Sequence, residues 1–185
     1  MSDEDLSRFL SGRNPIFSDE ADWSKGQIQL EINYYLSDVI PPLELISSVR
    51  AIVFKREEVL TVEEAENEFH ILPGGRREEN ERLEETAQRE VAEETGWTLY
   101  KLKPFSVAHF KHTTPKPEDY PYPYPNFLWL IYTAEAVDFD RERMFSAERL
   151  AEEYVISSLF RPISQTYDKL TKRDQALLKV LMNSK

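Results

Sequence analysis

The alternation of apolar and polar positions predicts several strands in this chain. Apolar and polar residues alternate over 28–32, which is the period of a half-buried strand. Segments 49–54 and 59–62 are rich in β-branched residues and predict two strands joined as a hairpin. Pro104 is expected to break the chain between two later strands, because proline lacks the N–H that a sheet uses. Further short apolar segments predict strands at 69–72, 99–103, 105–110, 127–137 and 154–156.

Helical periodicity is strongest from Leu83 to Thr95, and Gly96 follows it as a candidate C-cap. A second helix is expected over 165–182, with its leucines on the buried side. Ser146 is expected to cap a short helix. Strands before and after a central helix predict an α/β layered domain with a mixed sheet.

The domain organisation is predicted from composition along the chain. Residues 1–26 are polar and acidic with scattered aromatics, and we expect them to form an N-terminal extension that packs on the domain. Residues 27–185, including the C-terminal helix, are long enough for one well-cored domain. Residues 113–126 hold five prolines and three tyrosines, which predicts a stiff surface loop.

The charge balance restricts the class of partner. There are 34 acidic against 23 basic residues, and the formal net charge of -11 argues against binding to a nucleic acid polymer. A small anionic substrate remains compatible, because bound divalent cations can invert the local field.

The absence of cysteine and the shortness of the apolar segments indicate the cellular compartment of the protein. Without cysteine there is no disulfide framework, thiolate zinc site or cysteine nucleophile, which fits a cytoplasmic protein. The acidic N-terminus lacks the apolar segment of a signal peptide, and no apolar run approaches the ~20 residues that span a bilayer. We therefore expect no membrane partner.

Candidate chemistry is concentrated on the predicted helix before Gly96. Glu90, Glu93 and Glu94 fall on one arc about 100° wide of a helical wheel. Carboxylates so close repel one another, so we expect them to surround a cation. Oxygen ligands favour Mg²⁺, Mn²⁺ or Ca²⁺ over zinc. Gly75, preceded by another glycine, lets the backbone turn tightly and brings a carbonyl or N–H close to metal or phosphate.

Arg89 is four residues from both Glu85 and Glu93 and can pair with either of them. Such a site suits diphosphate hydrolysis, since metal ions neutralise phosphate charge and lower the pKa of a bound water. A remaining carboxylate can take the proton of that water. A glutamate-rich helix is more often only a solvated face, and Glu84 and Glu85 fit that interpretation.

The spacing of these residues resembles the Nudix box, G-x5-E-x7-R-E-U-x-E-E-x-G-U, in which U is a bulky aliphatic residue. The one departure is Trp97 at the final U position. The resemblance implies a Nudix-type α/β/α sandwich that hydrolyses the diphosphate linkage of a nucleoside diphosphate derivative or nucleotide, with Mg²⁺ or Mn²⁺ as cofactor. The matching residues are Gly75, Glu81, Arg89, Glu90, Val91, Glu93, Glu94 and Gly96.

The resemblance also implies roles for individual residues. Glu90 is expected to act as a metal ligand or general base, and Glu93 and Glu94 are expected to bind metal. The backbone carbonyl of Gly75 is expected to join them. Arg89 and Glu81 support these groups. A further acid from outside the box is expected at Glu153, with Glu152 nearly equivalent.

Substrate contacts are predicted at Tyr122, His109 and Arg76, with a small-molecule nucleotide as the partner. Tyr122 and its neighbouring tyrosines can equally shield a homodimer contact or form a plain surface loop, and a structural role for His109 is the competing interpretation. Two alternatives to a specific enzyme stay open. One is a catalytically silent Nudix-fold sensor that binds a nucleotide, and the other is a hydrolase of broad specificity.

Overall fold

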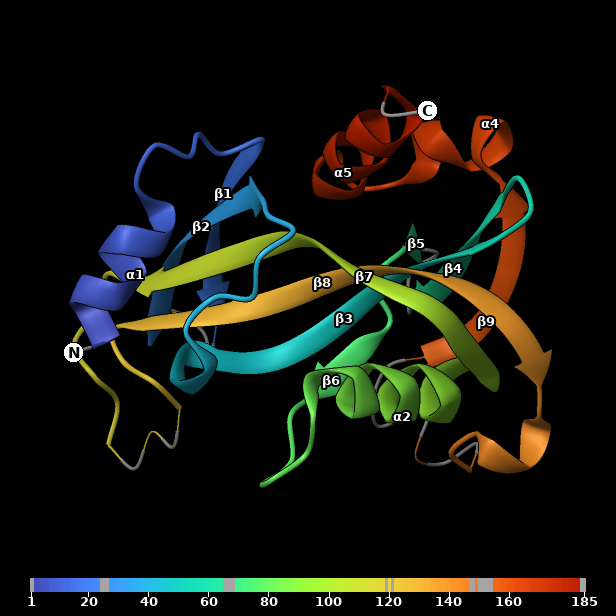
Figure 1. The fold of residues 1–185 in the computed structure, drawn as a ribbon, viewed down its shortest axis with the longest axis horizontal. Coiled ribbons are helices and arrows are strands. Elements are labelled where there is room, and N and C mark those ends of the chain that lie inside the picture. The colour runs from blue at the N-terminus through green and yellow to red at the C-terminus, as the bar shows by residue number, and fades with distance from the viewer. Residues whose placement is uncertain are drawn as a thin grey trace. The chain divides into compact units, whose positions relative to one another are not determined.

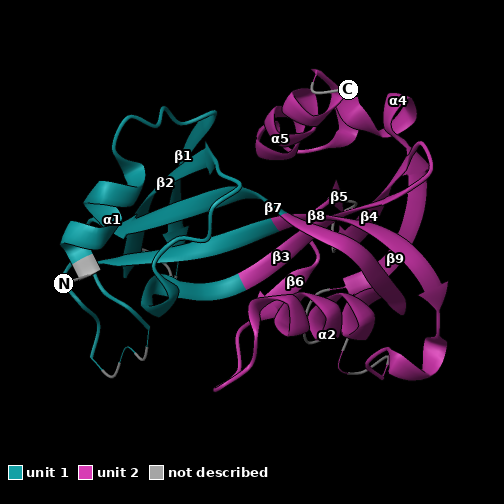
Figure 2. Ribbon diagram, in the orientation of Figure 1, with its two compact units in different colours: residues 1–48, 104–131 teal, residues 49–103, 132–185 magenta. Residues whose placement is uncertain are grey.

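The computed structural model describes residues 2–23, 27–64, 69–118, 120, 122–146, 149 and 155–183. The chain divides into two compact units, coloured separately in Figure 2. Unit 1 comprises residues 1–48 and 104–131, and unit 2 comprises residues 49–103 and 132–185. Three long strands, β3 (Ile46–Lys55), β7 (Trp97–His112) and β8 (Asn126–Phe139), contribute residues to both units.

Unit 1 holds the first two strands and the N-terminal helix. β1 (Phe17–Trp23) pairs antiparallel with β2 (Ile28–Leu36), which pairs antiparallel with β7. The alternation predicted over 28–32 is confirmed, because Leu30 and Ile32 are buried whereas Gln29 and Glu31 are exposed. The extension predicted for residues 1–26 stays a prediction. Its described residues include α1 (Ser2–Leu10) and β1, and unit 1 also contains the short 3-10 helix η1 (Leu43–Leu45).

Unit 2 contains the hairpin and the helix that the sequence predicted. The hairpin is confirmed: β3 pairs antiparallel with β4 (Glu58–Glu64), which also pairs with β5 (Phe69–His70) and β9 (Val155–Pro162). β6 (Gly74–Arg76) pairs with β3, and Figure 1 shows α2 and α5 on either side of the strands of unit 2. The helical elements of the unit are α2 (Leu83–Thr95), η3 (Arg141–Arg143), α4 (Ile163–Thr166), η4 (Tyr167–Lys169) and α5 (Lys172–Asn183).

The helix α2 has the predicted bounds because its sequence supplies both ends and a buried face. The N–H of Arg82 donates to Glu85 Oε2 at 2.9 Å and closes the first turn. Ala87 and Val91 are fully buried against the unit. Gly96 ends the helix in the left-handed region at φ 75°, with its N–H bonded to Ala92 O. The predicted α/β class with a mixed sheet is confirmed.

The prediction that Pro104 breaks a strand is wrong. β7 runs unbroken from Trp97 to His112. Phe105, which directly follows Pro104, still accepts a hydrogen bond at its carbonyl from the N–H of Ser37 at 3.0 Å. The strand therefore continues, because the pairing of its neighbours outweighs the donor that proline lacks.

The C-terminal helix is also shorter than predicted. Residues 163–169 form α4 and η4, and α5 begins only at Lys172. Leu170 is buried and makes an isolated parallel bridge to Phe69, so a tertiary contact interrupts the helical pattern there. Most of the short helix expected after Ser146 lies outside the described residues, although Arg149 N does donate to Ser146 Oγ at 3.3 Å. Among the described helices, none combines the length and apolarity needed to cross a membrane.

Candidate active site

Two glycines bring the backbone of β6 against β3 and α2. Gly74 has φ 138°, and a Cβ at this position would collide with the backbone of Val49. A Cβ on Gly75 would likewise collide with the carboxylate of Glu90. Gly74 requires glycine because its φ and the Val49 backbone exclude a Cβ, and at Gly75 the main chain lies against the Glu90 carboxylate of the helix.

A cavity of about 540 Å³ lies at this contact, within unit 2. Its volume is in the range of sites for small molecules. Carboxylates and guanidinium groups share its wall, so one part is suited to cations and another to phosphate. The residues that line it are Arg50, His70, Gly74, Gly75, Arg76, Glu78, Arg89, Glu90, Glu93, Glu94, Phe145, Arg149 and Val155.

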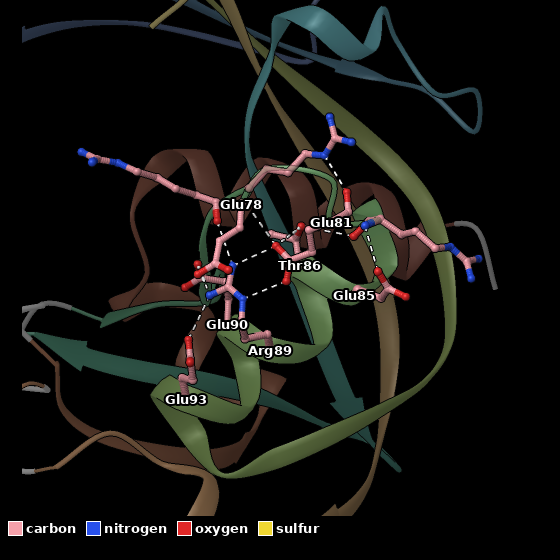
Figure 3. A network of polar contacts seen from close by, with 10 residues as sticks. Glu78, Glu81, Glu85, Thr86, Arg89, Glu90 and Glu93 are labelled. Atoms are coloured by element: carbon pink, nitrogen blue, oxygen red, sulfur yellow. Dashed lines mark hydrogen bonds and ion pairs between the residues drawn. The ribbon is translucent and has the colours of Figure 1, made fainter. Parts of the chain in front are cut away.

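One guanidinium organises the acidic side of this cavity. Figure 3 shows Glu81, Glu90 and Glu93 turned toward Arg89. Arg89 binds Glu81 through two nitrogens, Nε at 2.8 Å and Nη2 at 3.0 Å, in the bidentate geometry that suits a carboxylate. Its Nη1 donates to Glu90 at 2.8 Å and to Glu93 at 3.0 Å, and Nη2 also donates to the carbonyl of Arg76 at 3.0 Å.

The two carboxylates closest to Arg89 differ in proton affinity. The hydrogen bonds from Arg89 lower the pKa of Glu81 to about 2, and Thr86 Oγ1 adds a further donor at 2.8 Å. Burial raises the pKa of Glu90 above its ordinary value, although Arg89 opposes that shift. Glu81 therefore stays ionised as the partner of Arg89, whereas Glu90 holds a proton more readily.

Glu93 and Glu94, the other two acids that α2 contributes to the cavity, are each tied down by a hydrogen bond with the backbone of another segment. Glu94 Oε2 accepts a hydrogen bond from the N–H of Gly74 at 3.2 Å, which ties the end of α2 to β6. The carbonyl of Glu93 accepts from the N–H of Phe145 at 2.8 Å. These bonds hold both glutamates at the wall of the cavity.

The donor set fits a divalent cation in its chemistry. Three carboxylates, from Glu90, Glu93 and Glu94, line one cavity beside the backbone of Gly75, and all are oxygen donors. Within the described ranges, however, no three acidic or histidine side chains already converge as a metal-binding group. In this conformation Arg89 binds Oε1 of Glu90 and Oε2 of Glu93, so a cation would bind through the second oxygen of each carboxylate.

The remaining predicted site residues are placed differently. Arg76 lines the cavity. Glu153 and Glu152 lie outside the described residues. His109 belongs to unit 1, where it is buried and its Nε2 lies 2.8 Å from Asn126 Oδ1. Tyr122 also belongs to unit 1, with its ring edge-on to that of Tyr120 at 5.3 Å between centroids.

Several residues of the cavity were missed from the sequence, among them Arg50, His70, Phe145 and Arg149. Arg50 interrupts an apolar strand, and that pattern is a usable signal; its Nη1 donates to Leu72 O at 3.0 Å. Phe145 and Arg149 follow β8, and the guanidinium of Arg149 lies 3.7 Å from the centroid of the Phe145 ring. His70 ends β5. No pattern in the sequence connects these last three residues to the helix.

Comparison with known proteins identifies the fold. A NUDIX domain model matches residues 44–172. The Bacillus subtilis pyrophosphohydrolase BsRppH is 19% identical with a TM-score of 0.59, over 91% of this chain and 97% of that chain. A Nudix hydrolase from Nitrosomonas europaea is 18% identical with a TM-score of 0.56, over 76% of this chain and 90% of that chain. At such identities these structures show the fold alone, and no curated protein sequence is detectably similar.

These matches confirm the predicted Nudix-type fold and the predicted enzyme class, a Nudix-type hydrolase. The matched region includes the whole box from Gly75 to Trp97. Since the family model matches well over half of the residues of this chain, the chain belongs to the Nudix hydrolase family.

Proposed function

We propose that this protein hydrolyses the diphosphate linkage of a nucleoside diphosphate derivative in the cavity beside α2. One observation carries the proposal: three carboxylates of a single helix and four arginines line the same cavity. The carboxylates suit Mg²⁺ or Mn²⁺, and the guanidinium groups suit phosphate oxygens. Unit 2 therefore offers carboxylates for the cation and guanidinium groups for the phosphates of a metal–diphosphate complex.

Glu90, Glu93 and Glu94, with the carbonyl of Gly75, are the residues we propose to hold the cation. A divalent cation bound there supplies charge neutralisation of the diphosphate and a water of lowered pKa. Arg89 positions two of these carboxylates while Glu81 holds Arg89 in place. We retain Glu153 as the proposed additional acid from outside the box.

The other arginines of the cavity wall are proposed to bind the substrate. Arg50, Arg76 and Arg149 line the cavity with their side chains on different elements of unit 2. Guanidinium groups bind phosphate in paired hydrogen bonds, which orients the scissile linkage. The Phe145 ring offers an apolar surface next to Arg149. Tyr122 and His109 stay predicted substrate contacts.

Glu90 has one of two proposed roles: it holds the cation with Glu93 and Glu94, or it takes the proton of the attacking water. Its carboxylate lies against the backbone of Gly75 and receives one hydrogen bond from Arg89. A carboxylate fixed in this way can accept the proton of an attacking water. Because phosphoryl transfer depends mainly on positioning and charge neutralisation, these few groups suffice for the reaction.

One observation favours a second function, that of a nucleotide sensor. Arg89 binds Glu90 and Glu93 directly, so each of these two acids has a cationic partner before any metal binds. A protein that binds a nucleotide in this state would not cleave it. The two functions differ in whether turnover accompanies binding.

The test is a panel of nucleoside diphosphate derivatives incubated with the protein, with product identification, in Mg²⁺, in Mn²⁺ and in a chelator. We expect cleavage between two phosphates that requires the divalent cation. Tight binding of a panel member without turnover in any condition would support the sensor instead. Full activity in the chelator would contradict the proposed metal site.

A further inference from the structure

Unit 2 contains a second cavity, of about 780 Å³, that is rich in positive charge. Four cationic side chains line it: Lys55, Arg56, Lys101 and Lys103. Among the described residues on its wall, Glu135 is the one acid. The whole chain has a net charge of -11, so a local excess of three positive charges runs against its composition. We call this cavity the basic groove.

The fold, rather than a charge run in the sequence, collects these cations. Lys55 ends β3 and Arg56 begins the turn to β4. Lys101 and Lys103 are two residues apart on β7, the spacing at which strand side chains share a face. The basic groove and the cavity beside α2 have no described lining residue in common.

The backbone at two of these cations is strained. Arg56 has φ 58° and Lys101 has φ 55°, a left-handed region that residues other than glycine and asparagine seldom occupy. In two-residue hairpins, the position of Arg56 is usually taken by such residues. Strained residues of this kind cluster at functional sites, where the surrounding structure holds them. At two positions on this wall the fold therefore holds a cation in a backbone conformation that its residue type seldom adopts.

All four cations are exposed, and two of them, Lys55 and Lys101, have contacts that position them. Lys55 Nζ lies 4.1 Å from the centroid of the Trp97 ring, a cation–π distance. Lys101 Nζ lies 3.0 Å from Glu135 Oε1, and its side chain is still 53% exposed. Phe54 and Leu181 add apolar surface to the wall. The groove thus combines positioned positive charge with a smaller apolar part.

We infer that the basic groove binds a small oligophosphate anion, either inorganic or carried by a nucleoside. Several ammonium and guanidinium groups around one cavity match the adjacent negative charges of linked phosphates. The volume suits a small molecule. This anion site is independent of the proposed hydrolysis, because none of the carboxylates proposed to hold metal takes part in it.

The test is isothermal titration of the full-length protein with inorganic triphosphate in a chelator at low ionic strength. The chelator removes the cation that the proposed hydrolysis requires, and the variants of the groove's own lysines assign the remaining binding to the basic groove. We expect one equivalent to bind. The double variant Lys101→Gln/Lys103→Gln should weaken binding about tenfold or more, because charge-assisted hydrogen bonds are lost.

Two further variants keep the test specific. Glu135→Gln removes the competing carboxylate and should tighten binding, a gain that misfolding cannot produce. Lys111→Gln is the matched control, since Lys111 is also 53% exposed and also pairs with an acid, Glu31 at 3.8 Å. It should leave the affinity unchanged. Circular dichroism confirms that each variant is folded.

The outcomes separate clearly. Absence of binding overturns the inference. It is also overturned if Lys111→Gln loses half or more of the binding free energy that the double variant loses, because the effect would then follow the number of charges removed and not their place. Unchanged affinity in the double variant overturns it as well. The same titration with a nucleoside triphosphate distinguishes the two kinds of anion. Tighter binding than that of inorganic triphosphate would mean that the apolar part of the wall contacts the nucleoside. Equal binding would mean that the groove recognises the phosphates alone. None of these results depends on turnover in the cavity beside α2.

Discussion

The residue on which the acidic cluster depends most is Arg89. Its guanidinium makes hydrogen bonds to Glu81, Glu90 and Glu93 at 2.8–3.0 Å, and its side chain is 25% exposed. The fork geometry matters as much as the charge, because Glu81 is bound through two nitrogens at once. A lysine keeps the charge and loses this geometry.

We therefore expect Arg89→Lys to reduce kcat about 10- to 100-fold, since a small misplacement of catalytic groups has effects of that size. It should also lower the free energy of unfolding by about 1–3 kcal/mol. Steady-state kinetics and urea unfolding measure the two effects. Arg8→Lys, in an exposed pair with Asp5, is the control and should change neither. Wild-type kinetics for Arg89→Lys would refute the positioning role.

Glu81 gives the site a defined acid sensitivity. Its pKa is lowered in the folded state to about 2 from 4.5. A carboxylate with a depressed folded pKa adds stability above the unfolded value, and that stability is lost as the pH falls from about 4.5 toward 2. The advantage of the wild type over Glu81→Gln in urea unfolding should shrink across this window. A constant difference from pH 6 to pH 3 would argue against the ion pair with Arg89.

Among the elements, α2 was predictable to the residue and β7 and the C-terminal helix were not. The bounds of α2 follow from signals inside the segment: apolar spacing, the first-turn acid and Gly96. The continuation of β7 through Pro104 and the interruption at Leu170 depend on partners far away in the sequence, Ser37 and Phe69. Local patterns carry no information about such partners.

The end of α2 makes a prediction about stability. Gly96 has φ 75°, and a Cβ there would lie 2.7 Å from Phe139 Cε2 and 3.1 Å from Met144 Cγ. Gly12 has nearly the same φ, 73°, with nothing within 4 Å of such a Cβ. Gly12→Ala should cost about 1–2 kcal/mol for the backbone alone. Gly96→Ala should cost about 1–3 kcal/mol more for the crowding. Equal costs in chemical denaturation would show that Phe139 and Met144 move aside freely.

At the scale of the whole molecule, the sequence predicted the family and one wall of the site. The spacing of the box identified the carboxylates, which the structure places on one cavity in unit 2. Phe145 and Arg149 complete that cavity from the segment after β8, and the basic groove draws its cations from β3 and β7. Both features arise only when separate segments fold together, so no single window of sequence predicts them.

The central claim is that the carboxylates of α2 hold a divalent cation that diphosphate hydrolysis requires. It is tested most directly by turnover at saturating Mg²⁺ for Glu94→Gln beside Glu84→Gln, a variant on an exposed position of the same helix. Removing even an indirect support of a metal site costs about 10- to 100-fold, so we expect Glu94→Gln to lose at least ~100-fold in kcat/KM. Glu84→Gln should match the wild type. Wild-type turnover in Glu94→Gln would contradict the account.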